Sequence, residues 1–345
     1  MQIPQLRARR WPAALVACAV AVGTFVAAAP AHASPTPVGT SAFRGVNWAD
    51  PRDNYANGPV VPSELSTSDD YATTYRKAVA VLRGFRAEVG ANTVRLPVNP
   101  YSVGTAWWRS YRAAIKAASD LGFKVVLAYW EGTGTEKNGM VDNPPAWWSM
   151  WRTLTRLYRT DSNIYFEPMN EPFGYTAQQW TDLTAQWLDT FSAIPRGRVL
   201  IDGTGYADHV AAVCSDPRLD GALLALHDYG FWGTKTYDQW MADLHDRIAG
   251  CASRTVLDEF GVPMTTGIDY NGSTTAHDPA TNNYIAFLQA ATDTVRSLHM
   301  GSVYWPGLRT GDTYSLTSAV PDNGRPVLTV NNVSGLDRVH WGWGD

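Results

Sequence analysis

The sequence predicts one (β/α)8 TIM barrel, the α/β fold in which eight parallel strands each lead into a helix. Eight short apolar runs, rich in Val, Leu and Ile, alternate with longer helical patterns along the chain. Most of these runs are continuously apolar, as is typical of strands that are covered on both faces. Because no linker rich in Pro and Ser interrupts the alternation, we expect a single domain of about the usual size for this fold.

The expected strands are short, and in chain order they cover 43–48, 92–97, 123–130, 164–170, 198–202, 222–229, 254–261 and 301–306. The expected helices lie between them, at 68–88, 105–120, 145–160, 176–193, 235–249 and 279–298; the fifth connection, 206–213, is short, and the last, after Val327, holds only a brief helix. The first helix has the clearest ends, because Ser68-Asp69-Asp70 can start it and Gly90 can stop it. A doubly wound open sheet is the alternative, but no G-x-G-x-x-G follows the first strand.

Residues 1–33 have the pattern of a secretory signal peptide. Three arginines precede an apolar stretch that ends at Ala29, and the A-x-A-like site Ala31-His32-Ala33 follows. We therefore expect cleavage near Ala33, a catalytic barrel over 34–345 and a secreted, extracellular protein. A membrane anchor is the alternative, although the apolar stretch has only about the minimum length for a span.

Composition narrows the classes of partner. The net charge is −4 and no basic run stands out, so we expect no nucleic-acid partner. No later segment is long and apolar enough for a bilayer, so we expect no membrane partner, and we expect a monomer. Aromatic residues make up 12% of the chain and include fifteen Trp, which suggests that some of these rings face a ligand.

Two cysteines remain after the signal peptide, Cys214 and Cys251. In an oxidising compartment an even number of cysteines favours a disulfide, and two separate buried thiols are the alternative. No histidine stands at ligand spacing from them, so we expect no zinc site, no other metal and no cofactor.

Polar and aromatic residues gather at the ends of the expected strands. The active site of a barrel is built at the C-terminal ends of its strands, and these ends carry Arg95, Asn170, Glu171, His227, Tyr229, Glu259 and Trp305. Two of these residues are carboxylates from different strands. A glycosidase that retains anomeric configuration needs such a pair, a proton donor and a nucleophile, about 5–5.5 Å apart.

The motifs "NEP" at 170–172 and "LDEFG" at 257–261, both at strand ends, make the chain resemble glycoside hydrolase family 5, the cellulase family. The resemblance covers essentially the whole mature chain. It implies that Glu171 is the acid/base and that Glu259 is the nucleophile, with Arg95 and Tyr229 keeping Glu259 ionised. It further implies that Asn170 binds the sugar 2-hydroxyl, that His227 binds substrate or orients Glu171, and that Trp305 forms the floor under the sugar ring.

Other residues near strand ends have more than one interpretation. Trp48, Trp130 and Trp232 follow strands one, three and six, and we expect them to serve as sugar platforms. Glu167 lies two alternations deeper than Glu171, so we interpret it as a structural carboxylate that pairs with Arg95. Glu131 either lines the site or is a solvated loop acid.

The predicted function is that of a secreted retaining β-glycosidase that hydrolyses β-linked glucan- or mannan-type chains, as an endoglucanase does. The third strand ends in "LAYWEGTG" where many relatives carry His, and the loops at 131–145 and 306–316 could wall off one end of a cleft. An exo-acting β-mannosidase, β-glucosidase or furanosidase on short glycans is therefore an alternative. An inactive carbohydrate-binding barrel and a metal-dependent hydrolase are more distant ones.

Overall fold

The structure is a computed structural model that describes residues 39–133 and 137–344. The predicted signal peptide lies outside the described residues. Within the described ranges, no helix combines the length and the apolar character needed to cross a bilayer.

Eight strands form one parallel sheet, in the order β4-β3-β2-β1-β8-β7-β6-β5. A parallel bridge between Phe166 and Val199 joins the two outer strands, so the sheet forms a nearly closed barrel. The predicted barrel is therefore confirmed, and the open sheet is wrong. The strands are β1 (Arg44–Trp48), β2 (Thr93–Val98), β3 (Lys124–Tyr129), β4 (Ile164–Glu167), β5 (Leu200–Asp202), β6 (Leu223–Tyr229), β7 (Thr255–Gly261) and β8 (Gly301–Leu308).

Helices connect the strands at the positions that the sequence predicts, to within a few residues. The first begins where the side chain of Asp70 accepts a hydrogen bond from the backbone N–H of Thr73, and it ends at Gly90, which has a φ of 72°. The helices are α1 (Tyr71–Val89), α2 (Ala106–Asp120), α3 (Pro144–Tyr158), α4 (Ala177–Thr190), α5 (Thr204–Ala207), α6 (Ala211–Ser215), α7 (Tyr237–Ile248), α8 (Pro279–Ser297) and α9 (Val333–Trp343).

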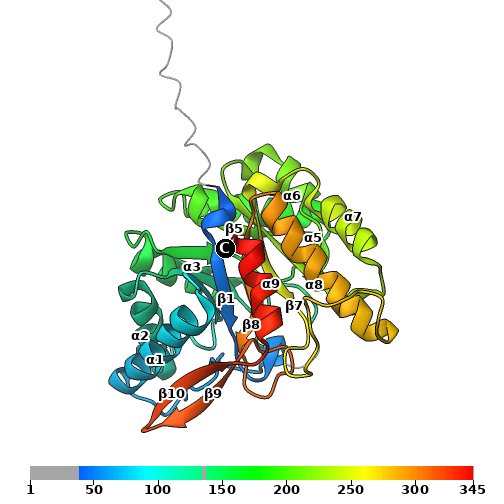
Figure 1. Ribbon diagram of the computed structural model, residues 1–345. Helices are drawn as coiled ribbons and strands as arrows, with labels where there is room; N and C mark the ends of the chain where they lie inside the picture. The colour runs from blue at the N-terminus through cyan, green and yellow to red at the C-terminus, as the bar shows by residue number, and fades with distance from the viewer. Residues whose placement is uncertain (1–38, 134–136, 345) are drawn as a thin grey trace, which may run out of the picture. The chain divides into compact units, whose positions relative to one another are not determined.

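An antiparallel hairpin follows the barrel strands and was not expected from the sequence. Its strands are β9 (Thr317–Asp322) and β10 (Arg325–Val330), and Figure 1 shows it projecting beside α1. Leu328 of β10 is buried against α1 at Gly84, where an added Cβ would lie 2.7 Å from the leucine Cγ. A glycine in the middle of α1 therefore gives the hairpin room to pack.

The barrel interior has an apolar lower layer and a polar upper layer. Inward residues recur at every second position of a strand. On β5, β6, β7 and β8 the lower layer holds one apolar cluster that includes Leu200, Ala225, Val256 and Val303. The residues two positions further along are Asp202, His227, Asp258 and Trp305. The strand period thus places polar and aromatic groups at the C-terminal mouth of the barrel.

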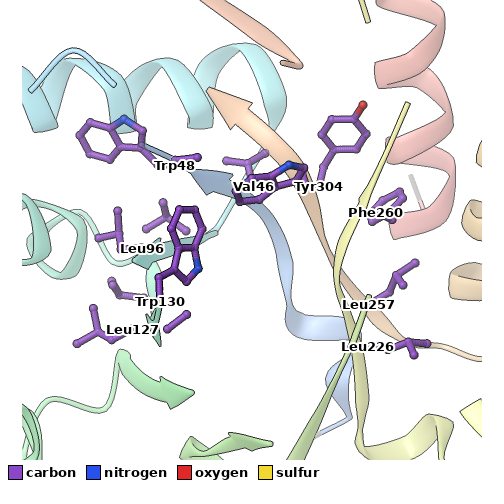
Figure 2. Packing of buried hydrophobic residues seen from close by; sticks show 14 of the residues in the cluster. Val46, Trp48, Leu96, Leu127, Trp130, Leu226, Leu257, Phe260 and Tyr304 are labelled. Carbon is purple, nitrogen blue, oxygen red and sulfur yellow. The ribbon is translucent and has the colours of Figure 1, made fainter. Parts of the chain in front are cut away.

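Trp48 belongs to the hydrophobic core, and the expectation that it serves as a sugar platform is wrong. Its side chain is fully buried among the residues shown in Figure 2. It packs edge-on against Phe85, with ring centroids 6.3 Å apart, and its indole N–H donates to the backbone carbonyl of Ser63 over 2.9 Å. The ring therefore faces α1, on the outside of the barrel.

A disulfide joins Cys214 in α6 to Cys251, which precedes β7, and their Cα atoms lie 6.4 Å apart. The predicted pairing is confirmed. The bond ties the short connection after β5 to the start of the strand that carries Glu259.

Candidate active site

The two candidate catalytic carboxyls, Glu171 and Glu259, meet at the mouth of the barrel. One oxygen of Glu171, a ring nitrogen of His227 and one oxygen of Glu259 all lie within 4.8 Å of one another. Glu171 follows β4 and retains 16% of its side-chain exposure, whereas the Glu259 side chain retains 6%. Glu171 and Glu259, which are 88 residues apart in the sequence, are therefore neighbours in space.

A shift of register on β7 directs Glu259 into the mouth. Leu226 pairs with Leu257, but His227 pairs with Glu259, so Asp258 is an extra residue on β7. Such a bulge re-aims the side chains that follow it. Asp258 remains in the inward layer, fully buried, and Glu259 also reaches the cleft.

Glu259 has charged and hydroxyl partners that favour its ionised form. The guanidinium of Arg95 donates to its Oε1, and the hydroxyl of Tyr229 donates to Oε2 over 2.7 Å. Burial raises the pKa of Glu259, whereas the charge of Arg95 and the Tyr229 hydroxyl lower it. Because Glu259 bonds directly to a cation, it is the better placed of the two carboxyls to remain ionised.

Glu171 has the opposite surroundings. Burial, followed by the negative charge of Asp53, raises its pKa to about 8, although Arg95 opposes both effects. Its Oε1 lies 3.1 Å from Nδ1 of His227. Burial lowers the pKa of His227 to about 4, so near neutral pH this ring is an uncharged partner. One carboxyl is thus set to hold a proton beside another that is set to lose it.

Arg95 is the centre of the polar layer under these carboxyls. Its Nε donates to Glu167 over 2.7 Å, and its second terminal nitrogen bonds to Glu167 and, over 2.7 Å, to Oδ1 of Asn170. The remaining nitrogen bonds to Glu259 and, over 3.0 Å, to Oδ1 of Asn47. One guanidinium therefore orients Asn170 and Glu259 together, and Glu167 occupies the structural place expected of it.

A cleft of about 410 Å³ lies above this layer. Trp305 and Trp130 line it with ring centroids 5.5 Å apart, and Trp232 and Tyr206 also line it. Sequence reasoning overlooked Asp53 and Asn54, which line the cleft from the loop after β1. The polar stretch "PRDN", which begins shortly after the expected first strand, was the available signal.

Glu131 has neither of its two expected roles. It is buried, and its carboxylate accepts backbone hydrogen bonds from Asn138 and Gly139, at 3.2 and 2.9 Å. Glu131 is therefore a structural residue that holds the backbone at Asn138 and Gly139 in place.

Two clusters in the described part of the chain have the donor atoms for a metal ion, Glu167 with Asp202 and His227, and Glu171 with His227 and Glu259. Arg95 already contacts carboxylates of both clusters, Glu167 and Glu259. It supplies at the centre of the layer the positive charge that a metal would bring.

A (β/α)8 barrel with two carboxyls paired at its mouth is the arrangement that glycoside hydrolases use. A model of the cellulase family, glycosyl hydrolase family 5, matches residues 56–306, and the chain belongs to this family. No curated protein matches the chain.

Solved structures of similar fold include endoglucanases. The catalytic domain of the major endoglucanase from Xanthomonas campestris pv. campestris has a TM-score of 0.61 at 16% identity, over 88% of this chain and 95% of that one. A hyperthermophilic endocellulase from the archaeon Pyrococcus horikoshii has a TM-score of 0.58 at 17% identity, over 88% and 93%. Its complex with cellotetraose gives 0.59 at 16%, over 86% and 92%. At these identities the likeness shows the fold.

Proposed function

We propose that the protein is a retaining β-glycosidase with Glu259 as nucleophile and Glu171 as acid/base. The observation that carries the proposal is the position of their carboxyls, which bring one oxygen each within 4.8 Å of the other. Retaining enzymes hold their carboxyls about 5–5.5 Å apart, whereas inverting enzymes leave about 6.5–9.5 Å for a water molecule. The present spacing supports retention.

The reaction proceeds in two displacements. Glu259 attacks the anomeric carbon while the protonated Glu171 gives its proton to the departing glycosidic oxygen, so a glycosyl ester forms as the aglycone leaves. Glu171, now a carboxylate, removes a proton from water, which attacks the same carbon and releases Glu259. In this proposal Asn170, whose Oδ1 bonds to Arg95, binds the sugar 2-hydroxyl, and Trp305, which lines the cleft, forms the floor under the sugar ring.

The proposed substrates are β-linked glucans or mannans. Membership of the cellulase family and the endoglucanase neighbours support this choice. The test is to incubate the protein with β-glucans, β-mannans and aryl β-glycosides and to follow product length and the anomer first released. A first product of inverted configuration would refute retention, and failure to cleave any β-glycoside would refute the function.

We also propose that the protein acts as a secreted monomer after cleavage near Ala33. The disulfide between Cys214 and Cys251 supports export, because such bonds persist in oxidising compartments.

Action on short glycans is a second candidate, and an ion-pair cluster on the cleft wall favours it. Arg309 lies 2.8 Å from Asp53 and 2.9 Å from Asp312, and all three residues line the cleft. Asp53 comes from the loop after β1 and the other two from the loop after β8. Their pairing fixes two loops against each other, which would restrict the length of chain that the cleft accepts.

Replacing Arg309 tests this wall. We expect Arg309→Ala to separate the two loops, because Asp53 and Asp312 then repel each other, and to raise the ratio of polymer to aryl-glycoside turnover several-fold. Arg325→Ala, on the exposed start of β10, should leave the ratio unchanged. If the Arg309→Ala enzyme kept the wild-type product lengths and the wild-type ratio of polymer to aryl-glycoside turnover, the proposal that the paired loops restrict chain length would be refuted.

The pH profile should be bell-shaped, with its limbs set by the two carboxyls. Turnover requires Glu171 protonated, so kcat/KM should fall as pH rises through about 8, the pKa of that group. Turnover also requires Glu259 to be ionised, so kcat/KM should fall at acid pH as well. The midpoint of this acid limb should lie above the ordinary pKa of glutamate, because burial raises the pKa of Glu259. Asp53→Asn removes a charge that raises the pKa of Glu171, so the alkaline limb should move to lower pH. A fixed limb in that variant would contradict the assignment.

A further inference from the structure

We infer that Asp202, the last residue of β5, is a positioning residue that holds Glu171 in its catalytic orientation through the backbone. The inference rests on the proposed function, in which Glu171 is the acid/base. Oδ2 of Asp202 accepts a hydrogen bond of 2.9 Å from the backbone N–H of Glu171. Asp202 is fully buried, so water does not compete for this bond. The outer strand β5 thus fixes the backbone of Glu171, which follows β4, through this hydrogen bond.

The backbone of Glu171 needs a stabilising partner because its conformation is strained. Its φ is 50°, in the left-handed region that residues other than glycine seldom adopt. A conformation of this kind persists only where the surroundings fix it, and it is concentrated at functional sites. The carbonyl of Glu171 accepts from the N–H of Phe173 over 2.9 Å, and Asp202 fixes the other side of the residue. Without Asp202, the peptide can relax and carry the carboxyl away from its place.

Asp202 is itself held rigidly. Its position on β5 pairs with Ala225 of β6, and its backbone carbonyl accepts from the indole N–H of Trp180 over 2.7 Å. The side chain therefore presents Oδ2 to Glu171 from a fixed point. A catalytic group is placed best by a neighbour whose own geometry is locked in this way.

The surroundings of Asp202 favour its neutral form. Oδ1 is buried with no hydrogen-bond partner, and an oxygen of Glu167 and a nitrogen of His227 lie within 4.8 Å of an atom of this carboxyl. Burial raises the pKa of Asp202 well above its usual range, the charges of Glu167 and Asp258 raise it further, and Arg95 opposes them. A neutral carboxylic acid accepts the N–H of Glu171 through its carbonyl oxygen. An asparagine offers the same acceptor without a charge.

The test compares two variants whose side chains have the same number and branching of heavy atoms as aspartate, on two aryl β-glycosides of the same sugar. One carries a dinitrophenolate leaving group, which departs without a proton, and the other an alkyl-substituted phenol, which needs one. We expect Asp202→Leu, which removes the acceptor, to lower kcat/KM for the phenol substrate about 10- to 100-fold, as misplacement of a catalytic group does. The dinitrophenyl substrate should lose about threefold or less, since its cleavage needs little acid catalysis. Asp202→Asn should keep wild-type values for both.

Asp161→Leu is the matched control. Asp161 accepts a backbone N–H from Asn163 at the opposite end of β4, and its variant should keep the wild-type ratio of the two substrates. Equal losses on both substrates in Asp202→Leu would indicate a general structural defect and overturn the inference. So would an Asp202→Asn enzyme with the selective loss, and this second result decides the matter even if Asp202→Leu fails to fold. A wild-type protein that cleaves neither glycoside would instead refute the proposed function.

Discussion

Replacing Glu259 by alanine is expected to lower kcat by on the order of 10⁴-fold or more, because no other group can form the glycosyl ester. The described structure places no second carboxylate between Tyr229 and Arg95 that could attack in its stead, since Glu167 lies in the layer below and is bonded to Arg95. The loss should appear in kcat for every substrate, activated or not. Steady-state kinetics on an aryl β-glycoside would measure it.

Azide provides a second readout for the same variant. A small anion can enter the space that the Glu259 side chain vacates and attack the anomeric carbon in a single displacement that expels the aglycone, which gives a glycosyl azide of inverted configuration. Glu88→Ala, an exposed glutamate of α1, should leave kcat unchanged. Wild-type turnover by Glu259→Ala would exclude this residue as nucleophile, and an azide product of retained configuration would assign it to the acid/base role.

The sequence predicts the barrel well because its signal is local and repeated. Continuous apolar runs identify the strands, and the two-residue period then identifies the inward layer, so that Arg95 and Glu167 can be placed in one network before any coordinates are known. The end of α1 at Gly90 is equally local, because a left-handed residue there needs little else. Features that one segment determines by itself can be predicted from that segment.

The features that sequence reasoning overlooked depend on partners far along the chain. The burial of Trp48 depends on Phe85 and Ser63, which only the fold brings to it. The hairpin of β9 and β10 depends on Gly84 of α1, and each of its strands contains a proline that weakens the strand signal. The bulge that turns Glu259 inward is visible only as a mismatch of register with β6.

Arg95→Met should have the largest effect on stability. We expect the free energy of unfolding near pH 7 to fall by about 3–5 kcal/mol, because the change leaves buried carboxylates without their cation. Glu167 and Glu259 both bond to Arg95, and Asp258 lies 3.6 Å from it; all three are almost fully buried.

The pH dependence of this loss separates charge from packing. Burial raises the pKa of Glu259 even in the presence of Arg95, and without the guanidinium this pKa rises further. A carboxyl whose pKa is higher in the folded than in the unfolded state binds its proton more tightly when folded, so the native state gains stability as pH falls. The deficit of Arg95→Met should therefore shrink between pH 7 and pH 4, as measured by urea unfolding. Arg83→Met, on the exposed face of α1, should show little loss at either pH. A deficit that stays constant across this range would mean that Arg95 stabilises the barrel through the packing of its side chain and not through its charge.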